Sequence, residues 1–222
     1  MKKPKFRLVA EAFTLVVFLV LVLGVAILLA LLLPAVGNRP HTHRMPPCVN
    51  NLRQIGLALQ MFADENNNQF PPRVSITNGG SLELLSSNSP ALHFRTLSNY
   101  LSRNWLVFLC PADLSKQPLT NNGVLTDRNV SHFFSVDATP RTTNSVLAGD
   151  HNLEASGQPV KPGFFMLTTN TAVRWTREMH SRDPGRQCGC ILFADSHVEF
   201  LRTNLTAAVQ LRGLANNRLA VP

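Results

Sequence analysis

Side chains that bind metal ions are concentrated in the second half of the chain. They are carboxylates, imidazoles and thiols, at Asp150, His151, His180, Cys188, Cys190, Asp195 and His197. Zinc takes nitrogen, thiolate and carboxylate ligands of these kinds. The set therefore predicts candidate metal ligands at Asp150, His180, Asp195 and His197. No pair among them has the spacing of a familiar structural zinc motif, and calcium in a loop is an alternative.

Two of these aspartates also have an explanation that needs no metal. An aspartate at a tight turn hydrogen-bonds its own backbone, which fits Asp195 in the dipeptide Asp195-Ser196 and Asp150 at the end of a predicted strand. The sequence leaves the metal site and the turn as alternatives.

The chain has four cysteines, at Cys48, Cys110, Cys188 and Cys190. An even number of cysteines in an exported protein permits disulfides. We predict a Cys48–Cys110 disulfide, which would tie a helix to a distant loop. One glycine separates Cys188 from Cys190, so a bridge between them would be strained, and they stay reduced or pair elsewhere.

Catalysis has one weak candidate, a cysteine–histidine pair such as Cys110 with His132 or His180. Cys110 precedes a proline and fits a disulfide better than a nucleophile. The sequence contains no P-loop, no G-x-S-x-G elbow and no H-E-x-x-H motif. We expect a protein without enzymatic activity and without a cofactor.

The elements that must position these residues follow from hydrophobic periodicity. Cys48, Leu52, Ile55, Leu59 and Phe62 recur at steps of four, three, four and three, which predicts an amphipathic helix. The segment Asp-Glu-Asn-Asn-Asn then ends this helix.

Short apolar runs bounded by turn residues predict β-strands. They lie at 105–110, 132–138, 144–150 and 163–169, and a hairpin at 188–201 turns at Asp195-Ser196. A short helix is predicted within 91–102 and a terminal helix in the last twenty residues. The expected fold class is α+β, with the amphipathic helix packed on a small antiparallel sheet.

The N-terminal segment predicts a membrane anchor. The run from Phe13 to Val36 is apolar and uncharged, and as a helix it would span roughly 36 Å, more than the roughly 30 Å core of a bilayer. Basic residues precede the run, which favours a cytoplasmic N-terminus and a periplasmic body in an inner-membrane protein. The alternative is a secretory signal cut near Ala35 or Gly37.

The positive charge does not indicate nucleic-acid binding. The formal net charge is +8, but the basic residues are scattered, with no basic cluster and no interleaved aromatic residues. A nucleic-acid-binding surface would need a basic stripe, so we expect no nucleic-acid partner.

Two long stretches carry a resemblance to a known family: FTLVVFLVLVLGVAILLALLLPAV and CVNNLRQIGLALQMFADENNNQFPP. They resemble the prepilin-type, type II secretion system protein G-like (pseudopilin-like) proteins of Planctomycetes and Verrucomicrobia. The later blocks FLCPAD, SVLAGD and GCILFADSHVEF are similar to the same family in the same order.

The resemblance implies a pilin-like fold and a structural, non-enzymatic role in a secretion or pilus-like system. It implies a basic leader at 1–12, cut by a prepilin peptidase between Ala12 and Phe13 and then methylated. A transmembrane helix at 13–36, a proline-rich linker at 37–47 and an exported domain at 48–222 would follow. The implied partners are membrane lipid around 13–36, other pilin-like subunits and the peptidase.

The chain departs from the family at three places that concern processing and assembly. Ala12 replaces the usual glycine, Val17 replaces a glutamate, and prolines interrupt the helix beyond the apolar run. The alternative function is an anchored or secreted module that binds a glycan or a metal and keeps the fold without assembling into a filament.

Overall fold

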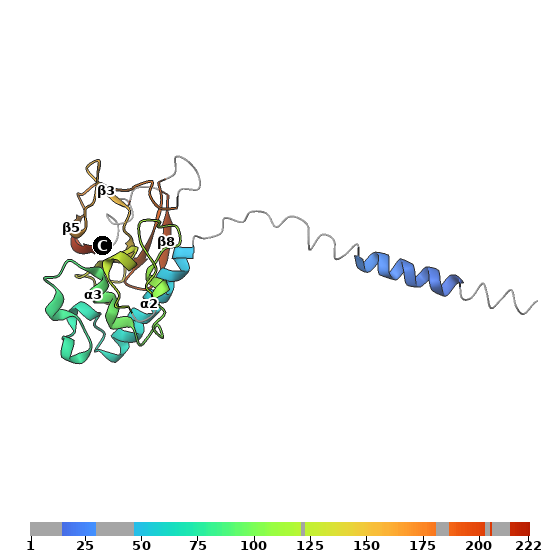
Figure 1. The fold of residues 1–222 in the computed structure, drawn as a ribbon, viewed down its shortest axis with the longest axis horizontal. Coiled ribbons are helices and arrows are strands. Elements are labelled where there is room, and N and C mark those ends of the chain that lie inside the picture. The colour runs from blue at the N-terminus through green and yellow to red at the C-terminus, as the bar shows by residue number, and fades with distance from the viewer. Residues whose placement is uncertain (1–14, 30–46, 121–122, 181–186, 203–204, 206–213) are drawn as a thin grey trace, which may run out of the picture. The chain divides into compact units, whose positions relative to one another are not determined.

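The computed structural model describes residues 15–29, 47–120, 123–180, 187–202, 205 and 214–222. The chain divides into two compact units, Met1–Arg44 and Met45–Pro222 (Figure 1). The predicted leader, the Ala12–Phe13 cleavage site and all of the predicted linker except Pro47 lie outside the described residues.

In the first unit, the described residues form a helix at 15–29 with exposed side chains. At about 1.5 Å per residue, this described part spans roughly 22 Å. Within the described part of the chain, no helix is both long and apolar enough to cross a membrane. The predicted transmembrane helix at 13–36 is therefore wrong, as is the inner-membrane, single-pass localisation that was inferred from it.

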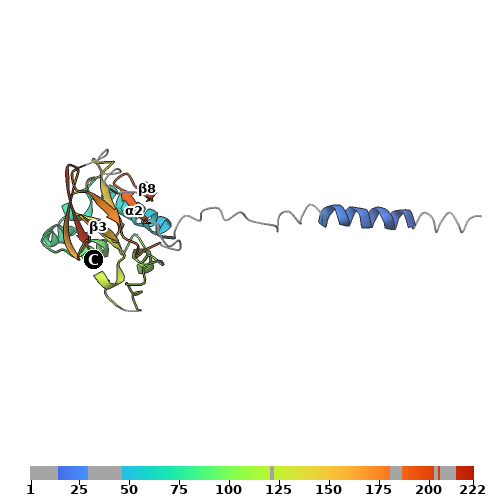
Figure 2. The same ribbon diagram turned by 90° about the horizontal axis from the view of Figure 1, so that it is seen from above.

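In the second unit, helix α2 (Pro47–Glu65) provides the amphipathic element. Pro47 suits the first helical position, because an N–H at that position would have no partner within the helix. The buried face carries Cys48, Val49, Leu52, Ile55, Gly56, Ala58, Leu59, Phe62 and Ala63. It packs on strands β7 (Gly189–Phe193) and β8 (Val198–Leu201), and both views show β8 beside α2 (Figures 1 and 2). A Cβ added at Gly56 would lie 2.8 Å from Leu192 Cδ1, so glycine permits this close approach.

Two antiparallel sheets make up the β part of the unit. The six-stranded sheet has the order β5-β9-β1-β2-β7-β8 and the three-stranded sheet has the order β4-β3-β6. The remaining strands are β1 (His132–Ser135), β2 (Val146–Asp150), β3 (Leu153–Ala155), β4 (Gln158–Pro159), β5 (Gly163–Thr168), β6 (Val173–Trp175) and β9 (Asn216–Val221). The second unit thus has α+β content.

Short helices fill the connection between α2 and β1. They are α3 (Pro90–Phe94) and the 3-10 helices η1 (Pro71–Arg73), η2 (Ile76–Asn78), η3 (Leu82–Leu84), η4 (Arg95–Leu97), η5 (Trp105–Phe108) and η6 (Asp127–Asn129). The strand predicted at 105–110 is wrong, because η5 occupies most of it. The Leu109 N–H donates to the Leu106 carbonyl over 3.1 Å, and Leu106 is exposed.

The end of the chain also differs from the predicted terminal helix. Most residues between 203 and 213 lie outside the described residues. Beyond them, Asn216–Val221 form β9, which pairs with both β5 and β1 inside the six-stranded sheet. The apolar residues of this segment alternate, and Leu219 and Val221 contribute to the core.

Alternation of side chains decides which residues of the central strands face α2. Every residue of β7 is buried, and successive side chains of a strand point to opposite faces. Cys190 and Leu192 belong to the apolar cluster that includes α2, whereas Ile191 and Phe193 belong to a second cluster on the other face. Cys190 is therefore directed toward the helix.

The same rule places two polar residues on the α2 face of neighbouring strands. Asp150 ends β2 and is two residues beyond Ala148, which lies in the cluster with α2. His132 begins β1, is paired with Asp150, and is two residues before Phe134 of the same cluster. The strand ends thus bring a carboxylate and an imidazole to the first turn of α2.

Candidate metal site

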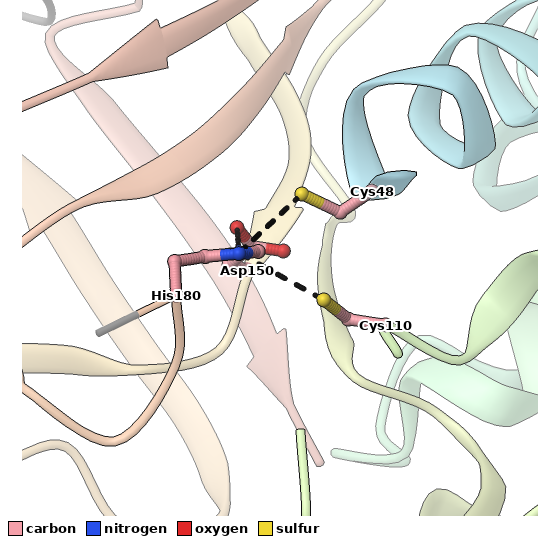
Figure 3. A group of neighbouring side chains, drawn as sticks. All are labelled: Cys48, Cys110, Asp150 and His180. Carbon is pink, nitrogen blue, oxygen red and sulfur yellow. Dashed lines mark hydrogen bonds and ion pairs between the residues drawn. The ribbon is translucent and has the colours of Figure 1, made fainter. Parts of the chain in front are cut away.

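Four potential ligand atoms converge at this end of the sheet. They belong to Cys48, Cys110, Asp150 and His180, and all lie within 4.8 Å of one another (Figure 3). Cys48 is in the first turn of α2, Cys110 follows η5, Asp150 ends β2, and His180 lies beyond β6. Among the described residues this is the group of histidine, cysteine and acidic side chains arranged to hold a metal ion.

The contacts meet at one atom, Nε2 of His180. It lies 3.3 Å from Cys48 Sγ, 3.8 Å from Cys110 Sγ and 2.9 Å from an Asp150 carboxylate oxygen. Figure 3 shows His180 pointing at the two thiols from the opposite side. A ring nitrogen offers one proton or one lone pair, so it cannot satisfy three partners at once. A cation at their common point would bind all four groups.

The separations suit tetrahedral zinc. With Zn–S near 2.3 Å and Zn–N near 2.0–2.1 Å, tetrahedral geometry places sulfur and nitrogen ligands roughly 3.6 Å apart. The two sulfur-to-nitrogen distances of 3.3 and 3.8 Å bracket that value. The 2.9 Å between His180 Nε2 and Asp150 Oδ2 is the length of a hydrogen bond.

Cys48 reaches the site because it belongs to the apolar stripe of α2. It is fully buried, and its sulfur also lies 2.9 Å from Cys190 Sγ. The N-terminus of a helix carries a partial positive charge that favours an anionic side chain. The position therefore suits a thiolate ligand.

The loop of Cys110 is braced on both sides. The Ala112 N–H donates to Cys110 Sγ over 3.4 Å, and Asn51 donates to the Leu109 carbonyl over 2.9 Å. Asp113 lies 2.8 Å from His151 Nε2, and His151 follows Asp150 in the chain. These contacts fix the thiol relative to the end of β2.

Asp150 is completely buried and contacts three polar groups. Its Oδ2 atom accepts a hydrogen bond of 2.7 Å from the Cys190 N–H and meets His180, while Oδ1 lies 3.2 Å from His132 Nδ1. Burial alone would raise the pKa of this carboxyl, but the two flanking histidines hold it well below its usual range. Asp150 is therefore an anion in the interior, which a cation would stabilise.

His180 adopts an unusual backbone conformation to reach the cluster, with a φ of 62°. This left-handed region is uncommon for residues other than glycine, although histidine, like asparagine and aspartate, adopts it more often than most, and residues held there cluster at functional sites. Burial lowers the pKa of the imidazole, but hydrogen bonds with Asp150 and Cys110 outweigh it and raise the pKa to about 10. Without a metal, the ring is a cation paired with Asp150.

The thiols are protonated in the metal-free protein. Contact with Cys110 lowers the pKa of Cys48, but contact with Cys190 and burial outweigh it and raise the pKa above its usual range. Contact with Cys48 and burial raise the pKa of Cys110. A coordinated cation reverses this balance, because a metal-bound thiol is deprotonated outright.

This geometry does not suit a cysteine nucleophile. The thiolate is the reactive species, and buried thiols with a raised pKa are inert. In a nucleophile–histidine–aspartate arrangement, the nucleophile and the carboxylate contact different ring nitrogens. Here Cys48, Cys110 and Asp150 all contact Nε2 of His180.

The predicted site residues separate into two groups. Asp150 and His180 lie together in the cluster, whereas Asp195 and His197 contact each other near the surface, at the turn between β7 and β8. Cys48 and Cys110 lie in the cluster as well. None of the four cysteines is in a disulfide, so the predicted Cys48–Cys110 disulfide is not formed.

Sequence reasoning missed Cys48 and Cys110 as metal ligands. Their sulfurs had already been expected to meet, and two thiols that meet in a fold are compatible with a bridge or with a shared metal ion. The signal that separates these alternatives is the position of His180 against both sulfurs, which only the fold reveals.

Comparison with known proteins gives no relative of this chain: no family model, no curated protein and no solved structure matches it. The resemblance to prepilin-type, G-like proteins and the expected pilin-like and peptidase partners stay predictions. The assignment to a type II secretion system as a pseudopilin has no support in these comparisons. Nor do the described residues contain the membrane-spanning helix that the assignment required.

Proposed function

We propose that residues 45–222 form a non-enzymatic, zinc-binding structural domain. Zinc would be held by Cys48, Cys110, Asp150 and His180. One observation carries the proposal: side chains from three other segments of the chain converge on Nε2 of His180. A metal ion relieves this competition, and four protein ligands complete a tetrahedral site without an open position for a substrate.

The donor set favours zinc over other common ions. Calcium and magnesium prefer oxygen ligands, whereas two thiols and an imidazole suit zinc. The carboxylate adds negative charge without changing that preference. Three of the four ligands are buried and His180 is largely so, which suits a permanently bound ion.

The proposed role is to hold together segments that are far apart in the sequence. Cys48 and His180 are separated by 132 positions, and Cys110 and His180 by 70. Because such a site is not preformed in an unfolded chain, the free energy of metal binding contributes to folding. Zinc would fasten α2 and the Cys110 loop to the end of the six-stranded sheet.

Metal analysis of the purified full chain tests the proposal. We expect one zinc per chain, and at least a 100-fold loss of affinity in Cys110→Ser and in His180→Gln, because each removes one ligand. The matched control is His197→Gln, which changes a histidine outside the cluster and should keep full affinity. Full zinc retention by both ligand variants would refute the proposed site.

A further inference from the structure

Cys190 has no part in the four-ligand site, yet it contacts one of the ligands. Its sulfur lies 2.9 Å from Cys48 Sγ, and both residues are fully buried. Two sulfur atoms at this distance are closer than ordinary van der Waals contact and farther apart than the roughly 2.05 Å of a disulfide. The two thiols are therefore in direct contact and are not bonded to each other.

The backbone holds both cysteines in this position. Cys190 belongs to β7, and its N–H donates to Asp150 Oδ2 over 2.7 Å. Cys48 is fixed by α2, whose apolar face packs on the same strand. The two sulfurs are therefore held beside each other by two elements that pack together.

We propose that Cys48 and Cys190 form a reversible disulfide that controls whether the site can hold zinc. This inference rests on the proposed function, because Cys48 is one of the four ligands. A sulfur committed to a disulfide is no longer a thiolate ligand. Oxidation would leave only Cys110, Asp150 and His180 as ligands, and zinc would lose one of its four ligands.

The chemistry requires an oxidant, for which we name a low-molecular-weight disulfide. Cys48 is inert while it is buried, so exchange requires local opening of the first turn of α2. The sulfur of Cys48, having lost its proton, then attacks one sulfur of the oxidant and forms a mixed disulfide, and one small thiol leaves with a proton. Cys190 then gives up its proton and attacks the Cys48 sulfur, and the second small thiol leaves. Two protein thiols are oxidised to one disulfide and one small disulfide is reduced to two thiols.

Zinc binding and the Cys48–Cys190 disulfide exclude each other, so each lowers the equilibrium population of the other. Zinc bound to Cys48 withholds that sulfur from exchange, and the disulfide withholds it from zinc. Linkage requires that the two effects be equal in free energy. Zinc should therefore protect the chain from oxidation to the extent that oxidation weakens zinc binding.

The other two cysteines are placed differently from Cys190. Cys188 is two residues earlier, and its sulfur lies 4.0 Å from the His180 carbonyl oxygen. Cys110 belongs to the ligand group, and its sulfur contacts both Cys48 and the imidazole of His180 (Figure 3). Peptide mapping distinguishes these pairings directly.

The test compares the full chain with and without zinc. Both forms are incubated with oxidised glutathione, quenched in acid, alkylated and mapped by mass spectrometry. We expect a Cys48–Cys190 cross-link in the zinc-free chain, formed at least tenfold more slowly when zinc is bound. Cys190→Ser and Cys190→Ala should lose the cross-link and keep zinc affinity under reducing conditions, while Cys188→Ser should keep both.

The outcomes separate this inference from the proposed function. Zinc binding without a Cys48–Cys190 cross-link, or with a Cys48–Cys110 cross-link instead, would overturn the switch alone. A cross-link in a chain that binds no zinc when reduced would overturn the proposed function and, with it, the control of zinc. Loss of zinc binding in both Cys190 variants, with unchanged circular dichroism, would overturn the switch by making Cys190 a ligand.

Discussion

Zinc should raise the melting temperature of the metal-free chain. A ligand that binds only the folded state at 100 times its dissociation constant stabilises it by about 2.7 kcal/mol. Residues 45–222 form one compact unit, and in a domain of this size each kcal/mol shifts the melting temperature by roughly 2–4 °C. The expected increase is therefore roughly 5–11 °C, measured by circular dichroism with chelator and then with buffered free zinc.

The variant Cys110→Ser shows whether the increase comes from the proposed site. A 100-fold weaker affinity at the same free zinc concentration reduces the stabilisation to about 0.4 kcal/mol, or roughly 1–2 °C. Cys188→Ser is the matched control, since Cys188 is a buried cysteine outside the ligand group, and it should keep the full shift.

Two results would refute the reasoning. In the first, metal analysis shows that the wild type binds zinc, but its melting temperature is the same with chelator and with zinc. Zinc binding would then not be coupled to folding. The other is an equal zinc-dependent increase in wild type and Cys110→Ser, because the metal would then lie elsewhere on the chain.

Three further predictions concern residues around the core. Asp113→Asn should weaken zinc binding 10–100-fold without removing a ligand, because Asp113 braces the Cys110 loop against His151; unchanged affinity in a chelator competition would contradict this. Gly189→Ala should destabilise the fold by about 1–3 kcal/mol in urea, since an added Cβ would lie 2.4 Å from Trp175; an unchanged midpoint would count against it. Burial lowers the pKa of His93 to about 4. The contribution of His93 to the free energy of unfolding is therefore present above pH 6.5 and is lost as the pH falls toward 4, by up to about 3 kcal/mol. His93→Gln should flatten this pH dependence of stability, and an equally steep loss in the variant would refute the prediction.

The local features of the fold could be predicted from the sequence. The apolar stripe of α2 and the β7–β8 hairpin both follow from periodicity within one segment, and the structure has both elements. In the hairpin turn, Ser196 has a positive φ of 69°. The run at 105–110 has the composition of a strand, but Trp105–Phe108 folds as a 3-10 helix that buries Val107 and Phe108.

The site could be predicted only in part, because its geometry depends on strand register. Asp150 and His180 were identified by ligand type alone, and so were Asp195 and His197, which lie at the other end of β7 from Cys190. Local sequence cannot tell which end of a strand faces the first turn of α2. The sequence predicted that Cys48 and Cys110 meet, which is correct, but it predicted a disulfide between them, which the fold does not contain.

Adjacent residues at the end of β2 have a mechanical consequence. Asp150 turns into the ligand cluster, while His151 holds Asp113 beside the Cys110 loop. Two of the four ligands, Asp150 and Cys110, are thereby held relative to each other before a metal ion binds. A preorganised half-site leaves ordering losses only for the remaining two ligands.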